Sequence, residues 1–157
     1  MAKPKLPGRK TVSRNKKAFF NYVIEEKLEA GLALLGAEVK AMREGNANLS
    51  DAYAFPKRRE LFLVNCRIGP YAAAALQAPD PLRERKLLLH RRQLDDLMSK
   101  VQESGYSLIP LELYFKDGFA KIELALCRGK THEDRREDIK SRESKREMDR
   151  AMRSRKA

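Results

Sequence analysis

Two alternating apolar runs on either side of Lys116-Asp117-Gly118 constrain the fold more than any other feature of the chain. Such a segment is typical of a β-hairpin turn, because Asp and Gly accept the backbone angles that tight turns require. The alternation places one set of side chains in the core: Ile109, Leu111, Leu113 and Phe115 on the first strand, and Ala120, Ile122, Leu124 and Leu126 on the second. Tyr114, Lys121 and Glu123 are expected on the outer face.

The rest of the central sequence predicts further strands and two helices. Extended structure is expected at 19–35, 51–55 and 60–68, and helices at 38–44 and 91–104. In the second helix an apolar stripe is formed by Leu94, Leu97, Met98 and Val101. This order of elements fits either an RRM or a small OB-type barrel, and periodicity does not choose between them. A second stacking aromatic residue, which an RRM needs, is absent.

Charge is distributed very unevenly along the chain. Residues 1–17 contain seven Lys or Arg and no acid, and residues 128–157 contain twelve basic and seven acidic residues. The intervening body has equal numbers of each sign, so the two ends carry the whole formal net charge of +12. A neutral body with basic ends favours nucleic acid as the partner over simply solvated tails or an anionic membrane.

Three segments follow from this pattern. Residues 1–17 are predicted to be a flexible basic arm, 18–128 an RNA-binding body, and 129–157 a basic tail. From Lys130 onward the only large aliphatic side chains are Ile139, Met148 and Met152, too few to hold the tail on the body. Opposite charges at helical spacing indicate a disordered tail that becomes helical on a partner.

No residue pattern supports catalysis, a cofactor or a metal. Gly129-Lys130-Thr131 lacks the glycine that a phosphate-binding loop needs, since Leu124 stands there. Single Cys and His residues without a CxxC or HxxxH pair do not form a metal site, and Cys66 and Cys127 are expected to be reduced core residues. The sequence has no run of 18 apolar residues. The protein is therefore expected to be a soluble, cytoplasmic, non-enzymatic protein.

Several ordered blocks carry a resemblance to a known family. They are Glu29-Ala30-Gly31, Gly36-Ala37-Glu38-Val39-Lys40, Asn48-Leu49-Ser50-Asp51-Ala52-Tyr53, Asp80-Pro81-Leu82-Arg83-Glu84-Arg85-Lys86-Leu87-Leu88-Leu89 and Asp134-Arg135-Arg136. In this respect the chain resembles the SmpB family of tmRNA-binding proteins from about Asn15 to Met152. The resemblance implies a mainly β, OB-fold-like antiparallel barrel with two or three flanking helices and a disordered or helix-prone tail. It also implies a monomeric adaptor of trans-translation.

The resemblance also implies which residues meet RNA. The body would bind the tRNA-like domain of tmRNA through Asn15, Lys16, Glu29, Arg83, Arg85, Lys86, Leu88 and Lys121. Of these, Arg83, Arg85 and Lys86 are natural phosphate partners. Without the resemblance, Leu88 fits barrel core better than a base contact, and Glu29 fits a plain surface charge.

The tail would enter the decoding centre and messenger channel of the small ribosomal subunit. The ribosome-binding residues implied are Tyr22, Arg128, Lys130, Asp134, Arg135, Arg136 and Met152. Tyr22 fits a partly buried strand position equally well. The chain departs from the family pattern at Phe19-Phe20, where Arg-His is common, and at Glu133, where some members have His. The histidines to which contacts with the decoding centre are assigned in the family are thus absent from these positions.

Overall fold

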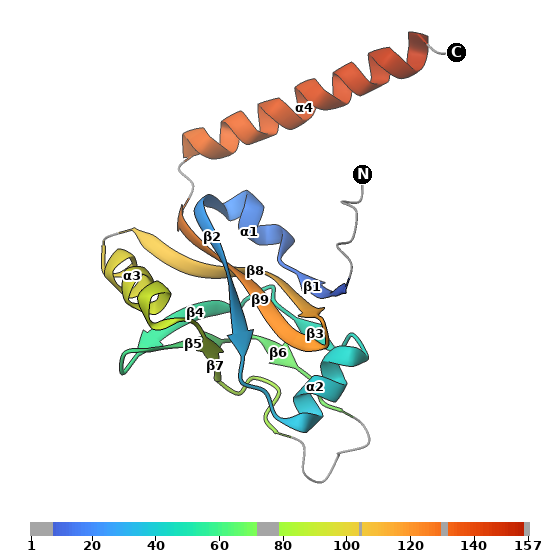
Figure 1. Cartoon of the computed structure of the whole chain (residues 1–157). Coiled ribbons are helices and arrows are strands. Elements are labelled where there is room, and N and C mark those ends of the chain that lie inside the picture. The colour runs from blue at the N-terminus through green and yellow to red at the C-terminus, as the bar shows by residue number, and fades with distance from the viewer. Residues whose placement is uncertain (1–7, 72–78, 104, 130–131, 156–157) are drawn as a thin grey trace.

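The structure is a computed structural model in which residues 8–71, 79–103, 105–129 and 132–155 are described. Nine strands and four helices follow one another in this part of the chain (Figure 1). The strands are β1 (Arg9–Arg14), β2 (Tyr22–Leu32), β3 (Ala47–Asn48), β4 (Tyr53–Lys57), β5 (Glu60–Val64), β6 (Arg67–Ile68), β7 (Arg85–Leu88), β8 (Tyr106–Lys116) and β9 (Phe119–Gly129). The helices are α1 (Lys16–Asn21), α2 (Gly36–Arg43), α3 (Arg91–Val101) and α4 (His132–Arg155).

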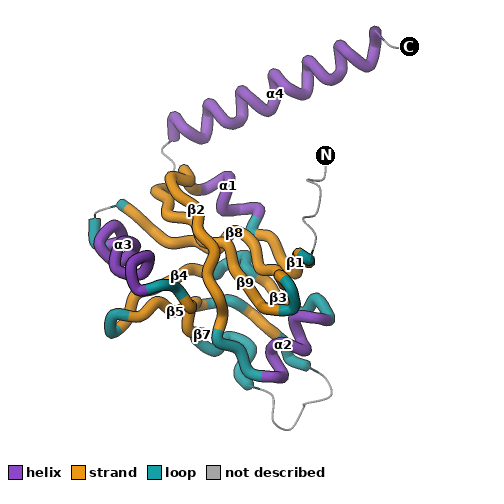
Figure 2. Tube along the Cα trace, viewed as in Figure 1, coloured by secondary structure: helices purple, strands orange, loops and turns teal. Residues whose placement is uncertain are grey.

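The main sheet closes on itself. Its strand order is β1-β8-β4-β5-β7-β2-β9, and an additional pairing joins β8 to β9, so six strands form a ring and β1 is added at the outside of β8. All of these pairings are antiparallel. Figure 2 shows the helices outside this barrel, with α4 projecting away from it. The closed ring confirms the OB-type barrel and excludes the RRM alternative, whose sheet is open.

The predicted hairpin is confirmed. Asp117 and Gly118 have φ angles of 50° and 84°, as the turn chemistry requires, and Lys116 pairs with Phe119. The alternation is interrupted by a bulge between Pro110 and Glu112, where β8 contributes one residue more than β9.

The bulge divides the predicted core residues of β8 between two apolar clusters. Leu113 and Phe115 lie in the main core, with Ile122, Leu124 and Leu126 of β9. Ile109 and Leu111 lie in a second cluster beneath α1, with Ala18, Ala125 and Cys127. The prediction of a single inward face on β8 was therefore wrong, because sequence alternation does not reveal an inserted residue.

The prediction of a mobile arm over residues 1–17 was wrong for its second half. Residues 9–14 form β1, which pairs antiparallel with β8, and residues 16–21 form α1. Helix α1 replaces the extended structure expected from Phe19, and its N-terminus is capped by the side chain of Asn15. The segment is ordered because its backbone hydrogen-bonds to the edge of β8. Residues 1–7 lie outside the described part.

The other helices agree with the sequence patterns. Helix α2 begins at Gly36 and is stabilised by Glu38, which accepts a hydrogen bond from the backbone N–H of Leu35 at 2.9 Å. Helix α3 buries Leu94 and Leu97 of the predicted stripe and packs on the barrel. Helix α4 confirms the helical tendency of the tail, whereas disorder of the tail before it meets a partner stays a prediction. Within the described residues, no helix is long and apolar enough to cross a membrane.

Candidate nucleic-acid interface

Three predicted RNA-contacting residues meet on one outer face of the barrel. Gly31 of β2 pairs with Leu88 of β7 on one side and with Lys121 of β9 on the other, and Glu29 lies two residues before Gly31. The three side chains of Glu29, Leu88 and Lys121 line one open depression of about 640 Å³. We call this surface the sheet face.

Leu88 is exposed on the sheet face rather than buried in the barrel. Its exposed fraction is 49%, whereas that of Leu87, its neighbour on β7, is 2%. A Cβ atom on Gly31 would lie 3.2 Å from Cβ of Leu88, so the glycine leaves room for this side chain. The core alternative for Leu88 is therefore wrong, and an exposed leucine is available to pack on a base.

The carboxylate of Glu29 is held in place from β8. The hydroxyl of Tyr114 donates a hydrogen bond to Oε2 of Glu29, and Nζ of Lys116 lies 3.5 Å from the same oxygen. The hydrogen bond from Tyr114 is the main cause that keeps the pKa of Glu29 below its ordinary value, with Lys116 and Lys121 adding to it. Glu29 thus remains ionised at neutral pH and can accept hydrogen bonds from base or ribose donors.

Tyr114 is in turn covered by the N-terminal strand. The guanidinium of Arg9 lies 3.7 Å from the centroid of the Tyr114 ring, and its Nη2 lies 2.9 Å from Oε2 of Glu112. Tyr114 therefore lies on the outer face, as expected, but it is buried there. The burial of Tyr114 was not expected from sequence patterns, because residues 1–17 were expected to be mobile.

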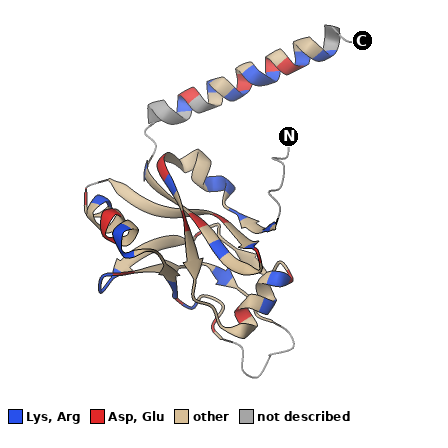
Figure 3. Cartoon of the chain, viewed as in Figure 1, with Lys and Arg blue, Asp and Glu red and all other residues tan. Residues whose placement is uncertain are grey.

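Charges of both signs alternate across the sheet face. Lys27 lies 3.9 Å from Glu123, and Arg9 lies 3.6 Å from the same carboxylate. Figure 3 shows acidic and basic positions interspersed along the strands of the barrel. The face is therefore patterned rather than uniformly basic, and such a surface favours a partner of defined shape.

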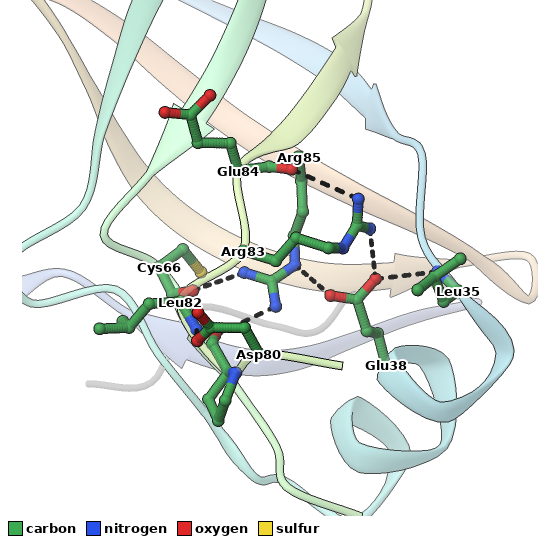
Figure 4. A network of polar contacts seen from close by, with 9 residues as sticks. Leu35, Glu38, Cys66, Asp80, Leu82, Arg83, Glu84 and Arg85 are labelled. Atoms are coloured by element: carbon green, nitrogen blue, oxygen red, sulfur yellow. Dashed lines mark hydrogen bonds and ion pairs between the residues drawn. The ribbon is translucent and has the colours of Figure 1, made fainter. Parts of the chain in front are cut away.

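Arg85 does not lie on the surface, and its prediction as a phosphate partner is wrong. Its side chain is fully buried, with Nε 2.5 Å from Oε2 of Glu38. Its remaining nitrogens donate to the backbone oxygens of Cys66 at 2.6 Å and Pro81 at 3.1 Å, as Figure 4 shows. The contacts with Glu38 and Cys66 join segments distant in sequence, and the contact with Pro81 fixes the loop before β7, so Arg85 stabilises the fold and is not available to RNA.

Arg83 shares the same carboxylate and is only partly exposed. Its Nη2 lies 2.5 Å from Oε1 of Glu38, while its Nε is buried with no hydrogen-bond partner among the described residues. Burial opposes ionisation of Glu38, but the hydrogen bonds from Arg83, Leu35 and Arg85 together hold its pKa below the ordinary value. Arg83 therefore fixes the loop before β7 and offers only part of its guanidinium to a ligand.

Asn15, like Arg85, was predicted to contact RNA but has a structural role instead. It is buried, its Oδ1 accepts from the N–H of Ala18 at 3.2 Å, and its Nδ2 donates to the backbone oxygen of Pro110 at 3.1 Å. The prediction of an RNA contact at Asn15 is wrong, because every polar atom of the amide is used in capping α1 and joining it to β8. Lys16 is exposed beside it, and Lys86 is exposed with Nζ 2.9 Å from Glu60.

Of the predicted ribosome-binding residues, Tyr22 and Arg128 lie near the start of the tail, and the others belong to the tail itself. Tyr22 is half-buried against the second cluster, and Nε of Arg128 lies 3.4 Å from Oε1 of Glu25. Arg136 and Met152 are exposed on α4, which contacts the body at α1, where Arg142 lies 5.4 Å from the centroid of the Phe20 ring. Lys130 and the side chains of Asp134 and Arg135 lie outside the described residues.

Among the residues that the structure describes, no group of three or more His, Cys, Asp or Glu could hold a metal ion. Cys66 and Cys127 are free and buried, as the sequence predicted, and burial raises the pKa of each thiol to about 11. The thiols are thus protonated at neutral pH.

A closed antiparallel barrel with a charged, partly apolar face and a projecting basic helix is typical of small RNA-binding proteins. Comparison with known proteins narrows this class to one family. The model of the family described as "SmpB protein" matches residues 12–154. The chain belongs to the SmpB family.

Relatives of high identity support the same assignment. The chain is 62% identical to the SsrA-binding protein of Myxococcus xanthus, over 95% of this chain and 92% of the relative. It is 57% identical to the SsrA-binding protein of Anaeromyxobacter sp., over 92% and 88% respectively, and 49% identical to that of Geobacter sulfurreducens, over 93% and 95%.

A solved structure has the same fold. It is described as "tmRNA-SmpB: a journey to the center of the bacterial ribosome", and it aligns with a TM-score of 0.65 at 41% identity. The alignment covers 80% of this chain and 92% of the other. The barrel predicted from sequence is thus confirmed by a structural neighbour as well as by the strand pairings.

Proposed function

We propose that the protein binds tmRNA and acts as its adaptor in trans-translation, delivering it to stalled ribosomes as a single cytoplasmic chain without catalysis. The relatives are named for binding SsrA RNA, and the solved neighbour is a tmRNA-SmpB structure on the bacterial ribosome. One observation carries the proposal in this chain. An ionised Glu29, an exposed Leu88 and Lys121 lie side by side on a rigid sheet.

The sheet face has what an RNA of defined shape requires. Leu88 supplies apolar surface for an unstacked base, Glu29 accepts from base or ribose donors, and Lys121 is a partner for a phosphate. Lys16 and Lys86 are exposed cations that can add phosphate contacts nearby. The tRNA-like domain of tmRNA is the partner that we assign to this surface.

The tail is the second functional part. Helix α4 extends away from the barrel, and its described side chains are exposed. Arg136, Met148 and Met152 are thus available to an RNA-lined groove. We assign this helix to the messenger channel and decoding centre of the small subunit, with Tyr22 and Arg128 near its base. The division into an N-terminal segment, a body over 18–128 and a tail over 129–157 belongs to the same proposal.

A competition gel shift tests the assignment of tmRNA. Labelled tmRNA bound to the protein is challenged with unlabelled tmRNA or with bulk tRNA, and we expect bulk tRNA to compete much more weakly. Equal competition would instead indicate a general RNA-binding module. Lys121→Ala is the test variant, and Lys57→Ala, which removes an exposed lysine outside the sheet face, is its charge-matched control.

The salt dependence of binding gives an independent readout. If several phosphates are neutralised, affinity falls roughly a hundredfold between about 50 and 200 mM salt. Lys121→Ala should lower the slope of log affinity against log salt by roughly one unit, whereas Lys57→Ala should leave it unchanged. An affinity that is insensitive to salt would contradict the proposal.

A further inference from the structure

Phe119 has the highest exposed fraction among the large apolar side chains of the described residues, at 69%. It follows directly on the turn Asp117-Gly118, at the tip of the β8–β9 hairpin. A phenylalanine ring left in water forgoes the stabilisation that burial of its apolar surface would provide. A single exposed ring is ordinary on a protein surface, so its position must decide whether it has a role.

The tip that carries Phe119 is held firmly. The N–H of Asp117 donates to the backbone oxygen of Gly8 at 3.0 Å, and Lys116 pairs with Arg9 of β1 as well as with Phe119. Gly8 has a φ of 79°, and a Cβ there would fall 2.4 Å from Oδ1 of Asp117, so the strand passes close against the turn. The β1 strand therefore braces the hairpin tip, and the ring is presented on a fixed backbone.

Phe119 also belongs to the sheet face. Side chains two residues apart on a strand share a face, so Phe119 lies on the same side of β9 as Lys121. Residues paired across antiparallel strands share a face as well, which places Lys116 beside Phe119 and Tyr114 beside Lys121. The ring is thus flanked by two lysines and continues the surface that Glu29 and Leu88 begin.

Leu88 and Phe119 occupy opposite corners of this surface. Two strand spacings and two residues along β9 separate them, which corresponds to about 12 Å. Successive stacked bases lie only about 3.4 Å apart, so the two side chains cannot contact neighbouring bases of one stack. They suit two separate unstacked bases, as the loops of a folded RNA provide.

From this placement we infer that Phe119 stacks on an unstacked nucleobase of the bound RNA, with Lys116 and Lys121 on adjacent phosphates. The inference rests on the proposed function and adds a second base contact to the sheet face. The flanking lysines favour RNA over an apolar protein segment as the occupant. The carboxylate of Asp117 lies against Gly8, on the β1 side of the turn.

The first test compares two exposed phenylalanines. Stacking contributes about 1 to 3 kcal/mol per base, so Phe119→Ala should weaken tmRNA binding roughly fivefold to a hundredfold. Phe55→Ala is the matched control, because Phe55 is 54% exposed on β4, outside the sheet face, and it should leave affinity unchanged. The salt slope should not change in either variant, since no charge is lost. Equal affinities of Phe119→Ala and the unmodified protein would overturn the inference.

A fluorescence test uses the absence of tryptophan from the chain. Phe119→Trp introduces a single reporter, keeps an aromatic ring and should retain tmRNA affinity. Its emission should be quenched when tmRNA saturates the protein, because the indole stacks on a base. Unchanged emission in a fully bound complex would overturn the inference.

These outcomes separate the inference from the function on which it rests. If the unmodified protein does not bind tmRNA, the proposed function fails. If it binds while Phe119→Ala binds equally, only the stacking role fails. A Phe119→Ala variant that binds tmRNA normally but loses ribosome binding would assign the ring to a ribosomal partner and would also overturn the inference.

Discussion

The hydroxyl of Tyr114 reaches across β9 to donate a hydrogen bond to Glu29, so a residue of β8 orients a carboxylate of β2. Neither strand pairs with the other, and the contact exists only because both pair with β9. Arg9 covers the ring from the far side. Contacts from β1 to β8 and from β8 to β2 thus hold Glu29 in place on the sheet face.

Tyr114→Phe should weaken tmRNA binding about fivefold, because a hydrogen bond of about 1 kcal/mol no longer orients Glu29. The pKa of Glu29 should rise toward its ordinary value, since that hydrogen bond is the main cause of its depression. Affinity measurements and an NMR titration of the carboxyl group would check both effects. Tyr106→Phe is the control, because Tyr106 donates to Glu25 at 3.1 Å, away from the face. Equal effects of the two variants would contradict the prediction.

Glu38→Gln should lower the free energy of unfolding by about 3 kcal/mol, because it leaves the buried guanidinium of Arg85 without a counter-charge. Urea unfolding would measure the loss. Glu60→Gln, which removes an exposed partner of Lys86, should cost less than about 1 kcal/mol. A loss equal to that of the control would show that the buried pair contributes little.

Acid should unfold the protein partly through Glu38. The pKa of this carboxyl is depressed in the folded state, so its contribution to stability is fully present above its ordinary value of 4.5 and is lost as pH falls below it toward the folded pKa. Stability curves against pH for the unmodified protein and Glu38→Gln should therefore converge in acid. Curves that remain parallel below that value would contradict the prediction.

Leu87→Ala and Leu88→Ala should affect different properties, although the residues are neighbours on β7. Leu87 is buried, and its truncation should cost about 2 to 5 kcal/mol of stability with little effect on the RNA affinity of the folded protein. Leu88 is exposed, and its truncation should change stability by less than about 0.5 kcal/mol while weakening tmRNA binding. Thermal unfolding and gel shifts would separate them. A large stability loss in Leu88→Ala would contradict an exposed role.

Deleting residues 130–157 should leave tmRNA binding nearly unchanged and abolish peptide tagging on stalled ribosomes, because the sheet face lies on the barrel while α4 projects from it. Gel shifts and a tagging assay in a reconstituted translation system would measure the two effects. Full-length Met152→Ala is the companion variant that tests one apolar side chain of the helix. Loss of both functions on deletion would mean that the tail is part of the tmRNA interface.

A peptide of residues 132–155 should be only partly helical in plain buffer. Its opposite-charge pairs stabilise a helix by only about 0.2 to 0.5 kcal/mol each. Isolated helices of this kind are only marginally stable in water. Circular dichroism should show the helical signal increasing when an RNA partner is added. A full helical signal in buffer alone would contradict the expectation of a tail that gains structure on its partner.

Most of the local elements of this protein can be predicted from sequence patterns alone. Alternating apolar residues with Asp117-Gly118 specify the hairpin, and the spacing of Leu94 and Leu97 specifies the buried side of α3. These signals are readable because side-chain periodicity and turn chemistry act over a few neighbouring residues. Alternation along the hairpin placed Lys121 on the outer face, whereas the outward roles of Glu29 and Leu88 followed from family resemblance.

The packing of distant segments determines which polar side chains remain available to RNA. Arg85 and Asn15 look like surface ligands in sequence but are buried, because Glu38 and Cys66 reach Arg85, and Pro110 reaches Asn15, from distant segments. The order in β1, the burial of Tyr114 and the bulge at Leu111 likewise depend on strand pairing. Burial is set by which distant segments pack together, and local sequence does not contain that information.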